Sequence, residues 1–167
     1  MYATLREFID DWAPESSHTQ ELLDLLTDPS LEQEVHPGGR TLGRVAWHIA
    51  QTIPEMMART GLHVAGVDEH APVPSSAVDI ASGYRAASAS LLEQIRAHWT
   101  DSTLVETDDM YGESWSRATT LSILVKHQAH HRGQMTVLMR QAGLAMHGVY
   151  GPAKENWSQM GMQPPPV

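Results

Sequence analysis

Residues 127–134, HQAHHRGQ, place three imidazoles and one guanidinium within eight positions. They lie inside a longer segment, from Arg117 to Ala142, that contains no proline and no acidic residue. This segment is predicted to be one long helix that ends at Gly143. Its apolar residues recur at helical spacing, at Ile123, Leu124, Val125, Met135, Leu138 and Met139.

Two histidines of this helix are predicted to share a face. Residues four apart lie about 40° apart around a helix axis, with Cβ atoms roughly 6 Å apart. His127 and His131 therefore point the same way, whereas His130 falls towards the flank of the buried arc. Two neutral imidazoles on one face can chelate a transition metal, but one helix hardly supplies a complete coordination sphere. A metal bound here needs at least one ligand from elsewhere in the fold.

Three more helices are predicted before this one. The first runs from Tyr2 to Leu26 and contains Pro14, which should kink or restart it because proline lacks a backbone donor. The second runs from Thr41 to Thr60 and is closed by Gly61. The third follows the capping-box sequence that begins at Ser76 and extends to about Trp99.

The remaining segments connect or follow these helices. Residues 62–75 look like a long connection, and residues 100–116 form either a short hairpin or a loop. Pro152 suits the first position of a short terminal helix through about Met160. The sequence thus predicts an all-α fold, an up-down four-helix bundle with a short C-terminal helix. We expect a single domain over residues 1–160 and a proline-rich tail over residues 161–167.

Composition narrows the possible functions. The chain has 167 residues, a formal net charge of -9 and no cysteine, so any metal must be held by nitrogen and oxygen ligands. The acidic balance and only 11 Lys and Arg residues argue against a nucleic-acid partner. No run approaches the roughly 20 apolar residues of a membrane span, and the first residues lack a signal-peptide pattern. We expect a soluble, cytoplasmic protein with no membrane partner.

Other polar residues are candidates for the site. His48 lies at the margin of the apolar stripe of the second helix; a lone histidine there is more often structural than a ligand. Glu55 lies two turns further on, as a candidate base or ligand, although a solvent-exposed helix carboxylate is the commoner role. Gln134 lies one turn beyond the histidine pair and suits a supporting hydrogen bond. Arg132, about 100° from its neighbour, should point away from a bound ion.

The segment around the histidines is basic. A local positive field would suit an anionic substrate, although ordinary scatter of charges explains four cations about as well. These cations are Arg117, Lys126, Arg132 and Arg140.

Three strings carry a resemblance to a known family: GRTLGRVAWHIAQTIPEM at 39–56, HQAHHRGQM at 127–135 and GVYGPAKENW at 148–157. Together the sequence resembles the DinB-like (DinB/YfiT) superfamily of four-helix-bundle metalloproteins, over nearly the whole chain. The resemblance implies a metal triad of His48, His127 and His131, with His130 at a variable position. It also implies a divalent ion, commonly nickel, zinc, manganese or iron, with open positions for water or substrate, and a homodimer.

The resemblance leaves several activities open. Some members look like transferases acting on low-molecular-weight thiols such as bacillithiol or mycothiol, others are metal-dependent hydrolases, and many have no known reaction. Three neutral ligands leave the ion its double positive charge, so a bound water or thiol is acidified. We expect a thiol S-transferase with a small-molecule substrate and a diffusible thiol as cosubstrate. The alternatives are a hydrolase, a structural or stress-response metal-binding protein without turnover, and a metal-free cluster of hydrogen-bonded histidines.

Overall fold

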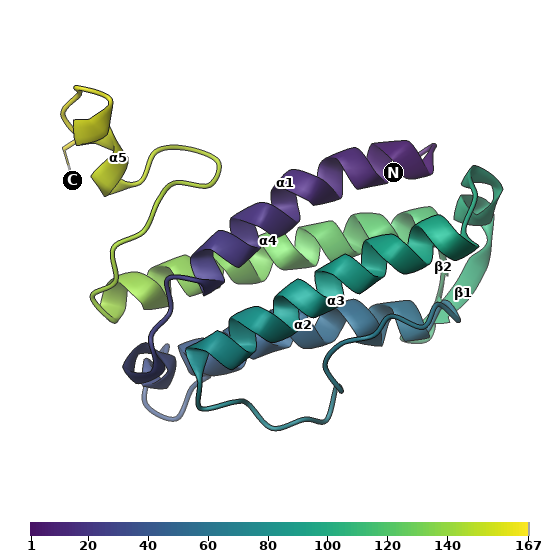
Figure 1. Ribbon diagram of the computed structural model, residues 1–167, viewed down its shortest axis with the longest axis horizontal. Helices are drawn as coiled ribbons and strands as arrows, with labels where there is room; N and C mark the ends of the chain where they lie inside the picture. The colour runs from purple at the N-terminus through teal and green to yellow at the C-terminus, as the bar shows by residue number, and fades with distance from the viewer. Residues whose placement is uncertain (167) are drawn as a thin grey trace.

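Four long helices make up most of the computed structural model, which describes residues 1–166 (Figure 1). A short helix, α5, follows near the C-terminus, beyond the end of the bundle (Figure 1). The all-α four-helix bundle with a short C-terminal helix is therefore confirmed. The helices are α1 (Leu5–Leu23), α2 (Leu42–Ala58), α3 (Ala77–His98), α4 (Arg117–Gln141) and α5 (Lys154–Gln159).

The directions of the four long helices follow the order up, down, down, up rather than strict alternation. The connection of residues 59–76 runs back along the bundle, so that α3 starts beside the start of α2 (Figure 1). Gln20 near the end of α1 donates to the carbonyl of Ala81 near the start of α3, at 3.2 Å. The guanidinium of Arg117 at the start of α4 donates to the carbonyl of Thr60, just beyond α2, at 3.1 Å. α4 is thus antiparallel to α2, and α1 is antiparallel to α3.

Each long helix begins at a hydroxyl residue, as local capping chemistry requires. The hydroxyl of the capping residue accepts a hydrogen bond from the backbone N–H three positions on, which satisfies a donor that has no partner within the helix. The predicted cap at Ser76 is present. The four caps are Thr4, Thr41, Ser76 and Ser116.

Two prolines have expected roles: Pro14 should kink or restart the first helix, and Pro152 should begin the terminal one. Pro14 lies inside α1, which continues through it as a single helix, so the helix does not restart there. Pro152 was expected at the first helical position of the terminal helix, but α5 begins two residues later, with Ala153 as its N-cap. The reason is local: the side chain of Asn156 accepts hydrogen bonds from the N–H groups of Gly148 and Ala153, which sets the helix start.

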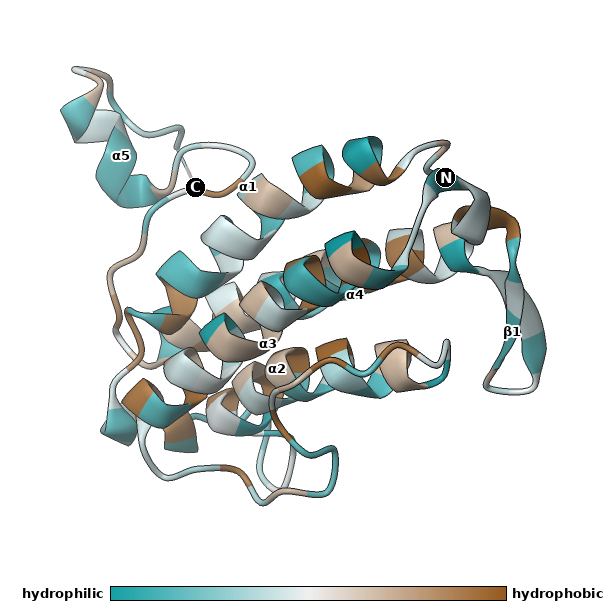
Figure 2. Ribbon diagram, turned by 45° about the vertical axis from the view of Figure 1, so that its right-hand side comes forward, coloured by the Kyte–Doolittle hydropathy of each residue, from teal (hydrophilic) through white to brown (hydrophobic). Residues whose placement is uncertain are grey.

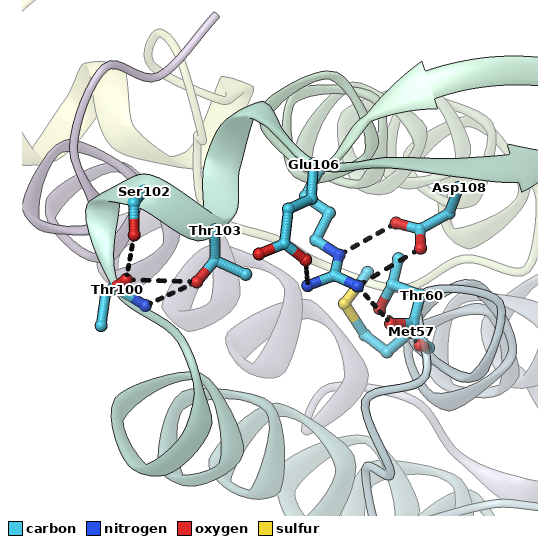
Figure 3. A network of polar contacts seen from close by, with 8 residues as sticks. Met57, Thr60, Thr100, Ser102, Thr103, Glu106 and Asp108 are labelled. Carbon is cyan, nitrogen blue, oxygen red and sulfur yellow. Dashed lines mark hydrogen bonds and ion pairs between the residues drawn. The ribbon is translucent and has the colours of Figure 1, made fainter.

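Residues 107–116 form a hairpin, which decides between the two predicted alternatives. Strands β1 (Thr107–Met110) and β2 (Glu113–Ser116) pair antiparallel. The turn residues Tyr111 and Gly112 have φ values of 61° and 87°, which suits the tight two-residue turn of a hairpin. The hairpin is anchored by the guanidinium of Arg117, which pairs with Glu106 at 2.6 Å and Asp108 at 3.0 Å (Figure 3).

The core runs through the centre of the bundle. Hydrophobic and hydrophilic segments alternate along the helices, as expected where one face of each helix is buried (Figure 2). Gly83 of α3 leaves room for Trp47 of α2, because a Cβ atom at residue 83 would lie 2.9 Å from the Trp47 ring. Within residues 1–166, no helix is long and apolar enough to cross a membrane.

A buried ion pair joins α1 to α4 on the side of α4 away from α2. The guanidinium of Arg132 is 2% exposed and pairs with the carboxylate of Glu15 at 2.5 Å. It also donates to the hydroxyl of Thr19 at 3.0 Å and to that of Tyr150 at 2.8 Å. Burial raises the pKa of Glu15, but the hydrogen bonds from Tyr150 and Arg132 outweigh it and hold the pKa below its ordinary value.

Glu15→Gln should lower the free energy of unfolding at pH 7 by about 3 kcal/mol, because it leaves Arg132 buried without a counter-charge. A carboxyl with a depressed folded pKa stabilises above its ordinary pKa of 4.5 and loses that effect as the pH falls through the folded value. Denaturant unfolding at pH 7 and through the range below 4.5 should therefore show a flatter acid dependence in the variant. Glu93→Gln, at an exposed position of α3, is the control. Equal stability of the two variants would contradict the role assigned to Glu15.

Candidate metal centre

The structure brings three histidines together between α2 and α4. His48 comes from the middle of α2, and His127 and His131 come from successive turns of α4. The centroid of the His48 ring lies 5.1 Å from that of His127 and 4.7 Å from that of His131. One ring nitrogen from each residue lies within 4.8 Å of the other two. Sequence spacing could pair only the two α4 histidines, and packing of the helices adds the third.

A hydrogen bond next to the histidines ties the two helices together. The side-chain amide of Gln128 is fully buried and donates to the backbone carbonyl of Ile49 at 3.1 Å. Gln128 follows His127 in α4, and Ile49 follows His48 in α2, so the bond lies directly beside the cluster. Residue spacing alone did not indicate a role for Gln128. The available signal was a glutamine within the apolar arc of α4, where a buried amide must find a partner.

Gln134 fixes the orientation of one imidazole. Its side-chain carbonyl oxygen lies 2.7 Å from Nδ1 of His131, and since that oxygen can only accept, Nδ1 carries the proton. The lone pair of His131 is then on Nε2, which lies 3.1 Å from Nε2 of His127. The amide nitrogen of Gln134 lies 3.0 Å from Nε2 of the exposed His130. The predicted supporting role of Gln134 and the flanking position of His130 are both present.

The environment of the cluster favours neutral imidazoles. Burial, followed by the neighbouring histidines, lowers the pKa of His48 to about 4. Burial likewise lowers the pKa of His127 to about 4, and it lowers the pKa of His131 below its ordinary value. All three side chains are therefore deprotonated at neutral pH. This is the form in which imidazole binds a metal ion.

The three residues fit a divalent ion. Nitrogen ligands about 2.0–2.1 Å from a tetrahedral ion lie roughly 3.3 Å apart, and the 3.1 Å between the Nε2 atoms of His127 and His131 is close to this separation. In the part of the chain that the structure describes, no carboxylate or fourth imidazole joins the group. Sites with three protein ligands keep a coordination position for water or substrate. The group could thus hold a metal ion with an open position.

Glu55, the other candidate, lies near the cluster without joining it. Its carboxylate accepts hydrogen bonds at 2.8 Å from the guanidinium of Arg59 and at 2.8 Å from the hydroxyl of Tyr111. Its side chain is 16% exposed, so it is not the freely solvated carboxylate that its helix position suggested. Its negative charge acts to raise the pKa of His127, against the larger effect of burial. The contact with Tyr111 depends on the hairpin, which sequence spacing could not place beside α2.

Most of the basic residues flagged around the histidines are already paired. Arg117 is bound to the hairpin, Arg132 to Glu15, and Arg140 to Glu155. The positive charges that act on the cluster come instead from the start of α2. Arg40 lowers the pKa of both His48 and His131, after the effect of burial. Residue spacing offered no reason to single out Arg40, because it lies in a loop eight residues before His48.

The fold is a four-helix bundle, and three imidazoles converge between two of its helices. The protein is therefore a helical-bundle protein with a candidate metal centre. The model of the DinB family matches residues 1–164, and the chain belongs to the DinB family. The "Uncharacterized protein YrdA" of Bacillus subtilis (strain 168) is 45% identical over 165 residues, covering 99% of both chains.

Solved structures agree with this assignment. The crystal structure of a DinB-like protein from Bacillus cereus ATCC 10987 has a TM-score of 0.87 and 49% identity, and the match covers 90% of this chain and all of that one. The DinB-like protein YjoA from Bacillus subtilis has a TM-score of 0.67 at 16% identity, over 87% of this chain and 98% of its own. The second match shows a shared fold alone.

Gln134→Leu should weaken metal binding by about 10–100-fold, the usual effect of losing a hydrogen bond that orients a metal-binding histidine. Competition with a chelator of known affinity measures the change. Gln141→Leu is the matched control, since it lies two turns further along α4 and has no bond to the cluster. Equal metal affinity in the two variants would remove Gln134 from the centre.

Proposed function

We propose that this protein is a metal-dependent enzyme that activates a thiol, or failing that a water, on the site formed by His48, His127 and His131. Within this class we propose a thiol S-transferase of the bacillithiol-transferase kind. The observation that carries the proposal is the donor set: three neutral imidazoles, of which two are half-buried and His131 is buried, with no fourth ligand in residues 1–166. A purely structural site would be expected to close its coordination sphere with a fourth protein ligand.

The residues of this chain have separable tasks in such a reaction. When bound, a divalent ion of the nickel, zinc, manganese or iron type supplies positive charge that favours thiolate over thiol and hydroxide over water. Burial between α2 and α4 keeps the three imidazoles neutral, and the carbonyl of Gln134 holds His131 with Nε2 facing the other ligands. Because the chain has no cysteine, the sulfur must come from a diffusible thiol.

Glu55 is the proton acceptor in the proposed reaction. Glu55 is the carboxylate whose charge reaches the cluster, and its pairing with Arg59 and Tyr111 holds it in place. A carboxylate in this position can accept the proton released when a thiol or water becomes a nucleophile. Hydrolysis would use the same positions with water in place of the thiol, so the choice of nucleophile is decided by assay.

Replacing each histidine by alanine tests the site. Elemental analysis of protein purified without an affinity tag should find near-stoichiometric metal in wild type and in His130→Ala, the matched control on the same helix. Metal should be lost in His48→Ala, His127→Ala and His131→Ala. Wild type that holds no metal after reconstitution with nickel, zinc, manganese and ferrous iron would end the enzymatic proposal.

Metal loss and heat stability should change together in His131→Ala. A ligand that binds only the native state stabilises it, by about 2.7 kcal/mol at a hundredfold excess over its Kd. Chelator should therefore lower the Tm of wild type and leave the Tm of the metal-free variant unchanged. An unchanged wild-type Tm in chelator would contradict metal binding by the native fold.

Glu55→Gln should leave the metal content intact and lower the rate of thiol transfer to an electrophilic aryl halide by about 100-fold, the usual contribution of a general base. Glu69→Gln, at an exposed loop position, is the control. Loss of metal in the Glu55 variant would make this residue a ligand. An unchanged rate would exclude it from the reaction.

A further inference from the structure

A pocket of about 480 Å³ adjoins the candidate metal centre on the side of the α2 N-terminus. Gln134 connects the pocket to the metal centre, because it lines the pocket and accepts a hydrogen bond from His131. Val45 lines the pocket one turn before His48 on α2, and Leu138 lies two turns beyond His131 on α4. The pocket therefore lies between α2 and α4, next to the three histidines, although none of them lines it. Its volume is that of a small-molecule site.

Four apolar side chains form one part of the pocket wall, and His36, Arg40, Gln134 and Gln141 form the rest. Val35, from the loop before α2, is 54% exposed, and Val137 of α4 is 59% exposed. Val45 and Leu138 form the buried part of the wall. A ligand with a short hydrocarbon body would cover these exposed side chains, which favours binding by about 25 cal/mol per Å² of apolar surface removed from water.

The charge of the pocket comes from Arg40. Six other arginines pair with carboxylates, whereas the guanidinium of Arg40 has no ion pair or side-chain hydrogen bond to any residue in 1–166. No acidic residue lines the pocket. The guanidinium is also near enough to the centre to act on the pKa of His48 and His131. An unpaired arginine beside an apolar wall is suited to a carboxylate, which its planar fork binds through two hydrogen bonds.

A second, larger pocket is lined by more acidic than basic residues. It measures about 710 Å³ and lies between the second half of α2 and residues 63–69. Its charged residues include Glu55, Asp68 and Glu69 against Arg59 alone, and Gln134, which bonds His131, does not line it. An anionic ligand is repelled there, so the smaller pocket is the better match to the centre.

We propose, on the basis of the function proposed above, that the pocket beside Arg40 selects a small thiol that carries a carboxylate. The carboxylate binds the guanidinium of Arg40, the hydrocarbon body lies against Val137 and Leu138, and the sulfur faces the three histidines. The cosubstrate class is thus an acidic aliphatic thiol rather than a neutral or cationic one. Arg40 binds the carboxylate of the thiol, and the metal ligands remain His48, His127 and His131.

Two thiols of equal length test the proposal on cobalt-loaded protein. The probes are 6-mercaptohexanoate and 6-mercaptohexanol, which differ only in the terminal carboxylate, and the readout is the thiolate-to-cobalt absorption band. Wild type should bind the carboxylate probe about 10-fold more tightly, the effect of one charged hydrogen-bonded contact. Arg40→Gln should lose this preference and bind 6-mercaptohexanol as wild type does, and Arg40→Lys should keep part of it.

Two further variants separate a local contact from a general effect of charge. Arg44→Gln removes a nearby positive charge whose side chain is bonded to Gln51 and does not line the pocket, so it should keep the preference. Val137→Glu places a carboxylate in the pocket wall and should weaken 6-mercaptohexanoate binding by about 10-fold.

The outcomes distinguish the two proposals. Protein that takes up no cobalt, or cobalt protein that binds neither thiol, would overturn the proposed function itself. Cobalt protein that binds both thiols equally, or whose preference survives Arg40→Gln, would overturn the acidic-thiol pocket alone. Loss of the preference in Arg44→Gln to the same degree as in Arg40→Gln would also overturn it.

Discussion

Burial of three imidazoles in one space between α2 and α4 is the constraint on which the candidate site depends. Charged imidazolium groups this close would repel each other and would lose their hydration, so the cluster is stable only while its members are neutral. The pKa values of His48 and His127 are lowered because protonating either ring in this buried cluster is unfavourable. The same condition leaves nitrogen lone pairs pointing into a common space. A site that disfavours protons is thereby prepared for a metal ion.

Two faces of α4 contact two different neighbouring helices. One face carries His127, Gln128 and His131 towards α2, and the adjacent residue Arg132 turns towards α1, where it meets Glu15. The separation of about 100° between successive helical residues makes this division possible. Because α4 contains no acidic residue, the counter-charge for Arg132 has to come from another helix. The buried ion pair thus holds α1 against a side of α4 that lies about 100° around the helix from His131.

The C-terminal segment contributes to the same ion pair. The hydroxyl of Tyr150 donates to Glu15 and accepts from Arg132, which ties the loop after α4 to the bundle. α5 is held further out by the pairing of Arg140 with Glu155. The resemblance of residues 148–157 to the family is therefore matched by a structural task, which is to complete the polar cluster between α1 and α4.

Much of the fold was predictable because its signals are local. Helical spacing of apolar residues, the hydroxyl caps such as Ser76 and the glycine stops indicated four helices with boundaries within a few residues. The spacing of His127 and His131 placed them on one face, and Gln134 one turn further on was recognised as their support. The hairpin stayed one of two alternatives, since short strands depend on a partner and on anchors such as Arg117.

By itself, the sequence determined the helices, the pair of histidines on α4 and the absence of sulfur ligands. Residue spacing along one helix settles these features through geometry that needs no neighbour. The family resemblance implied that His48 joins the pair, but residue spacing alone could not place it there. Only the tertiary structure decided that Glu55 is held by Arg59 and Tyr111, and that Arg40 is left unpaired beside a pocket. Those outcomes depend on which faces of α2 and α4 pack together and on where the loop before α2 returns. Contacts between residues far apart in the chain are fixed by packing of the whole bundle.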